Sequence, residues 1–123
     1  MALIKTLEQG RALKAYQFVD NIKKEHINDF KEYSQNLKKL PMLIKTNGLG
    51  NSLAFAKAKW SYIYDQISEW ILKLDSKVLL KHTDNKELLA LLIETDSTTY
   101  RAVTVETIAL LSWMKRIAEG MKD

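Results

Sequence analysis

The sequence lacks cysteine entirely and contains one proline and four glycines in 123 residues. Without cysteine, a disulfide framework, a thiolate nucleophile and a cysteine-based zinc site are all excluded. We expect a reducing, cytoplasmic compartment. No apolar run reaches 18 residues, and the first ten residues lack the apolar core of a signal peptide. We therefore expect neither secretion by that route nor a membrane partner.

Acidic residues are absent from one long segment. Residues 33–64 contain five lysines and no Asp or Glu, whereas residues 65–96 contain seven acids. The net charge of +4 permits an anionic partner without requiring one. The positive charge is thus segregated into one region.

The scarcity of glycine and proline, together with apolar residues at helical spacing, predicts an all-α protein. Thr6 and Gln9 form a capping box that begins a helix ending near Lys24. A final helix is expected from Thr99 to about Ala118. We expect residues 1–123 to form a compact single-domain bundle of about six or seven helices.

Two further helices are predicted in the second half of the chain. Ser61 can cap a long helix whose core stripe includes Trp70, and Asp84 with Glu87 can cap the apolar segment "LLALLI". We expect this apolar segment to be buried on most sides.

The only proline predicts a helix break. A residue that precedes proline is pushed toward an extended conformation, so the helix that begins near Ile27 is expected to end near Lys39. Pro41 then suits the first turn of a new helix.

The segment "TNGLGNS" predicts a glycine corner between two helices. Gly48 can adopt the positive φ that stops a helix, and Gly50 leaves room for a close backbone approach before the next helix begins around Asn51. Backbone amides at such a corner can hold a phosphate, although a purely structural corner is the simpler interpretation. The apolar side chains around the corner are expected to pack inward: Leu43, Leu49, Leu53 and Phe55.

The sequence offers no catalytic, metal or cofactor site. His26 and His82 lack metal-ligand spacing, and no P-loop, dinucleotide fingerprint or nucleophile elbow occurs. Asp65 and Glu69 share a helix face with Lys73 and Lys77, which indicates an exposed ion-pair ladder rather than a carboxylate dyad.

Cationic residues on two helices are better candidates. Arg101 and Lys115 differ in direction by about 40° and lie about 21 Å apart along one helix, with Ser112 on the same face. Such a row can meet successive phosphates of a nucleic acid. Arg11 and Lys14 form a similar pair on the first helix, where a solvated face is the alternative interpretation.

Three blocks resemble the small helical subunit of the Cmr complex, the type III-B CRISPR effector that targets RNA: "LEQGRALKAYQFV", "LPMLIKTNGLGNSLAF" and "YRAVTVETIALLSWMKRIAEG". The resemblance implies a non-catalytic, all-α protein that stacks in several copies along the guide and target RNA. Its other partners would be the backbone subunits and the large polymerase-like subunit. The resemblance assigns nucleic-acid binding to Arg11, Lys14, Lys45, Asn47, Lys57, Arg101, Lys115 and Arg116.

Two other functions stay open on the sequence alone. The acid-free surface can dock an acidic protein and never meet RNA, which would make the chain a structural packing module. A small enzyme would need Asp65, Glu69 and His26 to converge.

Overall fold

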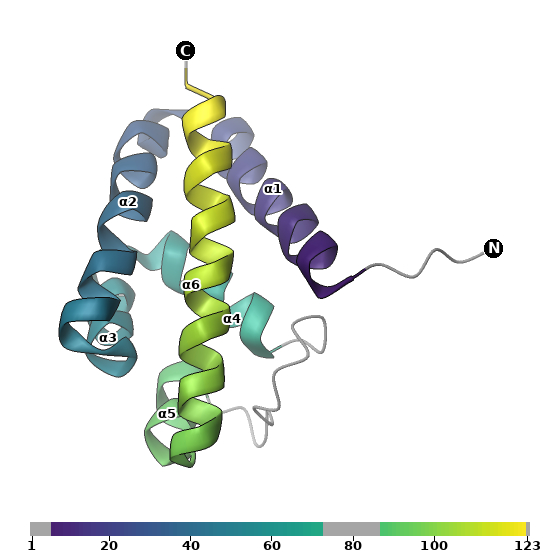
Figure 1. The fold of residues 1–123 in the computed structure, drawn as a ribbon. Coiled ribbons are helices and arrows are strands. Elements are labelled where there is room, and N and C mark those ends of the chain that lie inside the picture. The colour runs from purple at the N-terminus through teal and green to yellow at the C-terminus, as the bar shows by residue number, and fades with distance from the viewer. Residues whose placement is uncertain (1–5, 73–86, 123) are drawn as a thin grey trace.

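Every element in the described part of the chain is a helix, which confirms the all-α prediction (Figure 1). The computed structural model describes residues 6–72 and 87–122. Its elements are α1 (Leu7–Glu25), the 3-10 helix η1 (Ile27–Asp29), α2 (Phe30–Asn47), α3 (Leu49–Lys59), α4 (Ser61–Leu72), α5 (Leu88–Glu94) and α6 (Ser97–Gly120).

The longest helix, α6, crosses the front of the molecule between α1 and α2 (Figure 1). Helix α1 runs parallel to it, because Arg11 contacts Glu106 and Lys23 contacts the carbonyl of Met121 further along both helices. Helix α2 runs antiparallel to α6, and α4 lies behind α6 in the view of Figure 1. One face of α6 is therefore enclosed by three helices, while none of the described helices covers the opposite face, which we call the open face.

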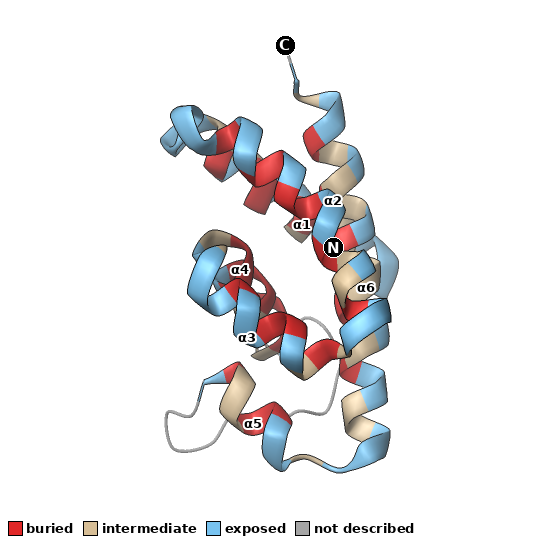
Figure 2. Cartoon of the chain, turned by 90° about the vertical axis from the view of Figure 1, so that its left-hand side faces the viewer, coloured by how far each residue is buried: buried red, intermediate tan, exposed pale blue. Residues whose placement is uncertain are grey.

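Buried side chains from all six α-helices form one apolar cluster. They line the inward faces of the helices, as the red segments in Figure 2 show. Trp70 lies within this cluster, as predicted from its stripe on α4. Burial of the shared apolar faces is the main force that holds the helices together.

The helix starts follow capping chemistry that can be read from the sequence. The Thr6 hydroxyl accepts from the Gln9 amide at 3.1 Å, and the Gln9 side chain accepts from the Thr6 amide at 2.9 Å, so the predicted capping box is present. Helix α6 begins two residues before its predicted start, because Asp96 accepts from the Thr99 amide at 2.7 Å. These side chains satisfy amides that have no partner inside the helix.

The predicted break at Pro41 is wrong, since α2 continues through this residue to Asn47. A proline inside a helix costs about 3 kcal/mol. Leu37, Leu40 and Ile44 flank it on the buried face of α2, and burying one such side chain contributes about 1.5–3 kcal/mol. Leu40 and Ile44 together offset the cost of the proline, so tertiary packing keeps one helix where local preference predicts two.

The segment "LLALLI" forms α5, as predicted, but its expected burial on most sides is wrong. Leu88, Leu91 and Leu92 are buried, whereas Ile93 is 74 % exposed. Leu89 and Ala90 are only partly buried, and α5 lies at one end of the molecule, where it contacts α3 and α4 (Figure 1). The predicted cap at Asp84, and the residues His82, Lys73 and Lys77, lie outside the described residues.

The glycine that ends α2 gives the first testable prediction. Gly48 has φ 85° and ψ 160°, a backbone conformation that residues other than glycine rarely adopt. We expect Gly48→Ala to lower the free energy of unfolding by about 1–3 kcal/mol in urea denaturation. Gly120→Ala is the matched control, because nothing lies within 4 Å of its added Cβ. Equal effects of the two substitutions would contradict the strain at Gly48.

Candidate nucleic-acid interface

The glycine corner is joined to the beginning of α6 by one hydrogen bond. The Gly50 amide donates to the Tyr100 hydroxyl at 2.8 Å. A Cβ on Gly50 would lie 3.3 Å from that oxygen, so the predicted close approach exists and Tyr100 makes it. Arg101 follows Tyr100 in the chain, and the glycine corner therefore adjoins the first turn of α6.

The amides of the two corner glycines already have partners, and two details of the predicted corner are wrong. The Gly48 amide donates to the Ile44 carbonyl and the Gly50 amide to Tyr100, so neither amide is available to hold a phosphate. Phe55 does not pack inward but is exposed, with its ring edge against Trp60 at a centroid distance of 4.9 Å. The helix after the corner also starts earlier than predicted, at Leu49.

The open face of α6 carries cations that form no ion pair within residues 6–72 and 87–122. Arg101, Ser112 and Arg116 are exposed, and Lys115 is half-buried. By helical geometry these four side chains lie within about 100° of one another over about 22 Å of helix. Val105, 69 % exposed, lies on the same face. Of the predicted row, Arg101 and Ser112 are thus exposed, whereas Lys115 is only partly so.

Arg11 has a different position from the solvated one considered above. Its guanidinium donates to both carboxylate oxygens of Glu106, at 2.6 and 2.8 Å, and its side chain is only 15 % exposed. The indole of Trp70 donates to the same carboxylate at 2.9 Å. The hydrogen bond to Glu106 raises the pKa of Arg11. Glu106, 5 % exposed, therefore joins α1, α4 and α6 through two partners.

Two other predicted cations are held by carboxylates. Lys14 lies 2.5 Å from Glu69 on α4, and Lys57 lies 2.5 Å from Glu87, which precedes α5. The hydrogen bond to Glu87 raises the pKa of Lys57. Exposed pairs of this kind stabilise a fold by about 0–1 kcal/mol, and they cancel charge locally.

A group of lysines that the sequence did not reveal lies where α2 passes the end of α6. The close approach of the Lys38 ammonium, together with the charge of Lys31, lowers the pKa of Lys122. Lys38 also lies 3.8 Å from Glu119. Lys31 and Lys38 lie about two turns apart on α2, and the antiparallel packing of α2 on α6 brings Lys122 to them.

Of the three residues that the small enzyme considered above would need, Asp65 and Glu69 line one pocket with Lys14, and His26 is not among the residues that line it. The described residues contain no group of three or more His, Asp or Glu side chains that could hold a metal. Glu69 pairs with Lys14, and the His26 ring packs against Tyr62 at a centroid distance of 4.8 Å. No helix in the described segments is both long enough and apolar enough to cross a bilayer.

Comparisons with known proteins agree with these features. A family model described as "CRISPR-associated protein (Cas_Cmr5)" matches residues 7–121. The chain belongs to the Cmr5 family. Its relatives include the CRISPR system Cmr subunit Cmr5 of Thermus thermophilus, which is 28% identical over 118 residues, 96% of this chain and 97% of the relative. A crystal structure of a Cmr5 family protein from the same organism has a TM-score of 0.75 at 26% identity, covering 97% of this chain and 100% of that chain.

The Glu106 contacts give a stability prediction for this Cmr5-family chain. Glu106→Gln removes the charge that neutralises Arg11, and we expect it to lower the free energy of unfolding by about 2–4 kcal/mol. Glu69→Gln is the control, because it breaks an exposed pair and should cost less than about 1 kcal/mol. Urea denaturation measures both. A loss at Glu106 no larger than that at Glu69 would show that the buried pair does not hold the helices.

Proposed function

We propose that this chain is a non-catalytic small subunit of a type III-B CRISPR effector, and that it binds RNA backbone through the open face of α6 and the adjoining corner. Its cationic side chains there have no carboxylate partner among the described residues, which is the observation that carries the proposal. The residues that we propose as RNA contacts are Lys45, Asn47, Arg101, Lys115 and Arg116.

Some of the predicted cations pair with a carboxylate and others do not, and this difference supports the smaller set of RNA contacts. Arg11, Lys14 and Lys57 are each held by a carboxylate, so a phosphate would have to compete with an existing ion pair. Arg101 and Arg116 face no such competition, and a guanidinium can hold a phosphate with two hydrogen bonds. Lys122 adds a cation at the end of α6, whereas Lys38 beside it is paired with Glu119.

A few phosphate contacts give weak binding that depends on salt. Several copies stacked along one RNA would act together, because each bound copy raises the effective concentration for the next contact. We therefore propose that guide and target RNA are held only by the assembled cytoplasmic complex. The backbone subunits, the large subunit and further copies of this chain are its protein partners.

A packing module without RNA contact is the second candidate. The exposure of Val105 on the open face of α6 favours it, because an exposed apolar side chain is typical of a protein contact. In that case the open face would touch another subunit, and the cations around Val105 would serve specificity rather than RNA retention.

The test removes three free cations at once. We expect Arg101→Ala with Lys115→Ala and Arg116→Ala to lower target-RNA retention by the assembled complex. The dependence of log K on log salt should fall by about 0.7 for each phosphate that the variant no longer neutralises. The control is Lys14→Ala with Lys57→Ala, which removes cations already paired with Glu69 and Glu87.

Filter binding across a salt series, at matched subunit composition, separates the two candidates. Lower RNA retention with unchanged composition supports RNA contact. Unchanged retention and salt dependence, or loss of the subunit from the complex without loss of salt dependence, would support the packing module.

A further inference from the structure

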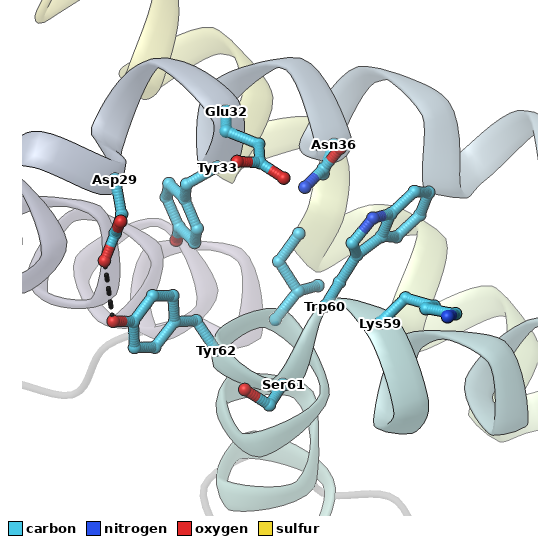
Figure 3. A pocket seen from close by; sticks show the side chains of 9 residues that line it. Asp29, Glu32, Tyr33, Asn36, Lys59, Trp60, Ser61 and Tyr62 are labelled. Carbon is cyan, nitrogen blue, oxygen red and sulfur yellow. Dashed lines mark hydrogen bonds between the residues drawn. The ribbon is translucent and has the colours of Figure 1, made fainter.

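A pocket with chemistry opposite to that of the cationic face opens between α2 and the junction of α3 with α4. Its volume is about 240 Å³. From α2 and the residue before it come Asp29, Glu32 and Asn36, and from the junction come Trp60 and Tyr62 (Figure 3). The pocket joins two carboxyl groups, a carboxamide and aromatic rings that are distant in the sequence.

The hydrogen-bonding groups of this pocket are not all satisfied. Asn36 is only 8 % exposed, yet within the described part of the chain its side chain makes no hydrogen bond, and Figure 3 shows it directed toward the pocket. Its carboxamide faces the accessible space of the pocket, where a ligand can bond to it. Glu32 has no cationic partner among the described residues. Asp29 accepts one hydrogen bond, from the Tyr62 hydroxyl at 2.9 Å, and its other oxygen is left to accept.

The aromatic rings line the same space. Tyr62 is fixed by its hydrogen bond to Asp29 and by the His26 ring, and Trp60 is fixed by its edge contact with Phe55. Ring faces attract cations through their quadrupole, and most strongly when the cation is shielded from water. Fixed rings add this attraction with little loss of side-chain entropy on binding.

We propose that this pocket binds an arginine side chain of a neighbouring protein subunit. A guanidinium is planar, so it can lie against an indole or phenol ring while its five donors reach acceptors at its edge. Glu32, Asp29 and the Asn36 carboxamide supply those acceptors, the amide being able to present its oxygen in one of two orientations that fill the same space. The site thus combines three acceptors with aromatic walls.

Size and charge select this occupant. Pockets for drug-sized ligands occupy about 300–1,000 Å³, so a cavity of about 240 Å³ suits one side chain better than a nucleotide. The two carboxylates would repel an RNA phosphate. A lysine ammonium can meet the carboxylates, but it cannot stack on the rings or reach three acceptors in one plane. Lys59 lies at the other end of the pocket, away from Asp29 (Figure 3).

The test uses the whole chain and a capped arginine, N-acetyl-arginine methylamide, followed by NMR. We expect saturable shifts of the Trp60 indole and Asn36 carboxamide resonances, with a Kd on the order of 1 mM, which is typical of a ligand this small. The capped lysine should bind several-fold more weakly. Glu32→Gln should raise the Kd about tenfold, because it removes a charged acceptor from a partly shielded site.

Asp65→Asn is the matched control, since it removes one exposed carboxylate from α4 outside this pocket. It should leave the Kd unchanged. No saturable shift with the capped arginine, or equal losses in the two variants, would overturn the proposal. So would stronger shifts with a uridine trinucleotide, which would assign the pocket to RNA. The result is independent of RNA binding at α6, because none of these residues lies on that helix.

Discussion

The fold depends on one buried carboxylate. Glu106 lies on the inner face of α6 and accepts hydrogen bonds from Arg11 on α1 and from Trp70 on α4. A carboxylate inside a protein is strongly unfavourable unless a cation and hydrogen-bond donors surround it. Helices α1, α4 and α6 must therefore meet at one register, and this fixes which face of α6 points inward.

The open face of α6 follows from that constraint. With Glu106 held inside, Arg101 and Arg116 point away from the core, on a surface that none of the described helices covers. The same helix thus uses charge in two ways. Inside, Glu106 and Arg11 neutralise each other and orient the helix. Outside, cations that have no ion-pair partner among the described residues are available to a polyanion. The Tyr100 hydrogen bond adds the glycine corner to this surface.

Much of the fold could be predicted from sequence because it depends on local chemistry. The capping box at Thr6 and the helix stop at Gly48 each involve residues a few positions apart. The helix break predicted at Pro41 is absent, because burial of Leu40 and Ile44 outweighs the local preference of proline. That burial depends on the packing of α2 against its neighbours. Local rules describe helix ends well and describe competition with tertiary packing poorly.

The candidate site was harder to predict, for a related reason. Arg11 and Arg101 look alike in sequence, and only the fold shows that Glu106, 95 residues from Arg11, holds the first. The pocket between α2 and the α3–α4 junction left no signal either, because Glu32 lies on α2 and Trp60 lies between α3 and α4, and only the fold places both in one pocket lining. Whether a charged side chain has an ion-pair partner depends on contacts between residues that are distant in the sequence.

Two surfaces of opposite chemistry result: a cationic one on α6, which we propose binds RNA, and an acidic, aromatic pocket, which we propose binds an arginine of a neighbouring subunit. The claim that α6 faces RNA is tested most directly by photocrosslinking the assembled complex to target RNA that carries thiouridine, with the adducts mapped by mass spectrometry. Our account predicts adducts in the peptides that contain Lys45–Asn47, Arg101 and Lys115. Adducts confined to the peptides around Asp29 and Trp60, or an absence of adducts on this subunit, would contradict it.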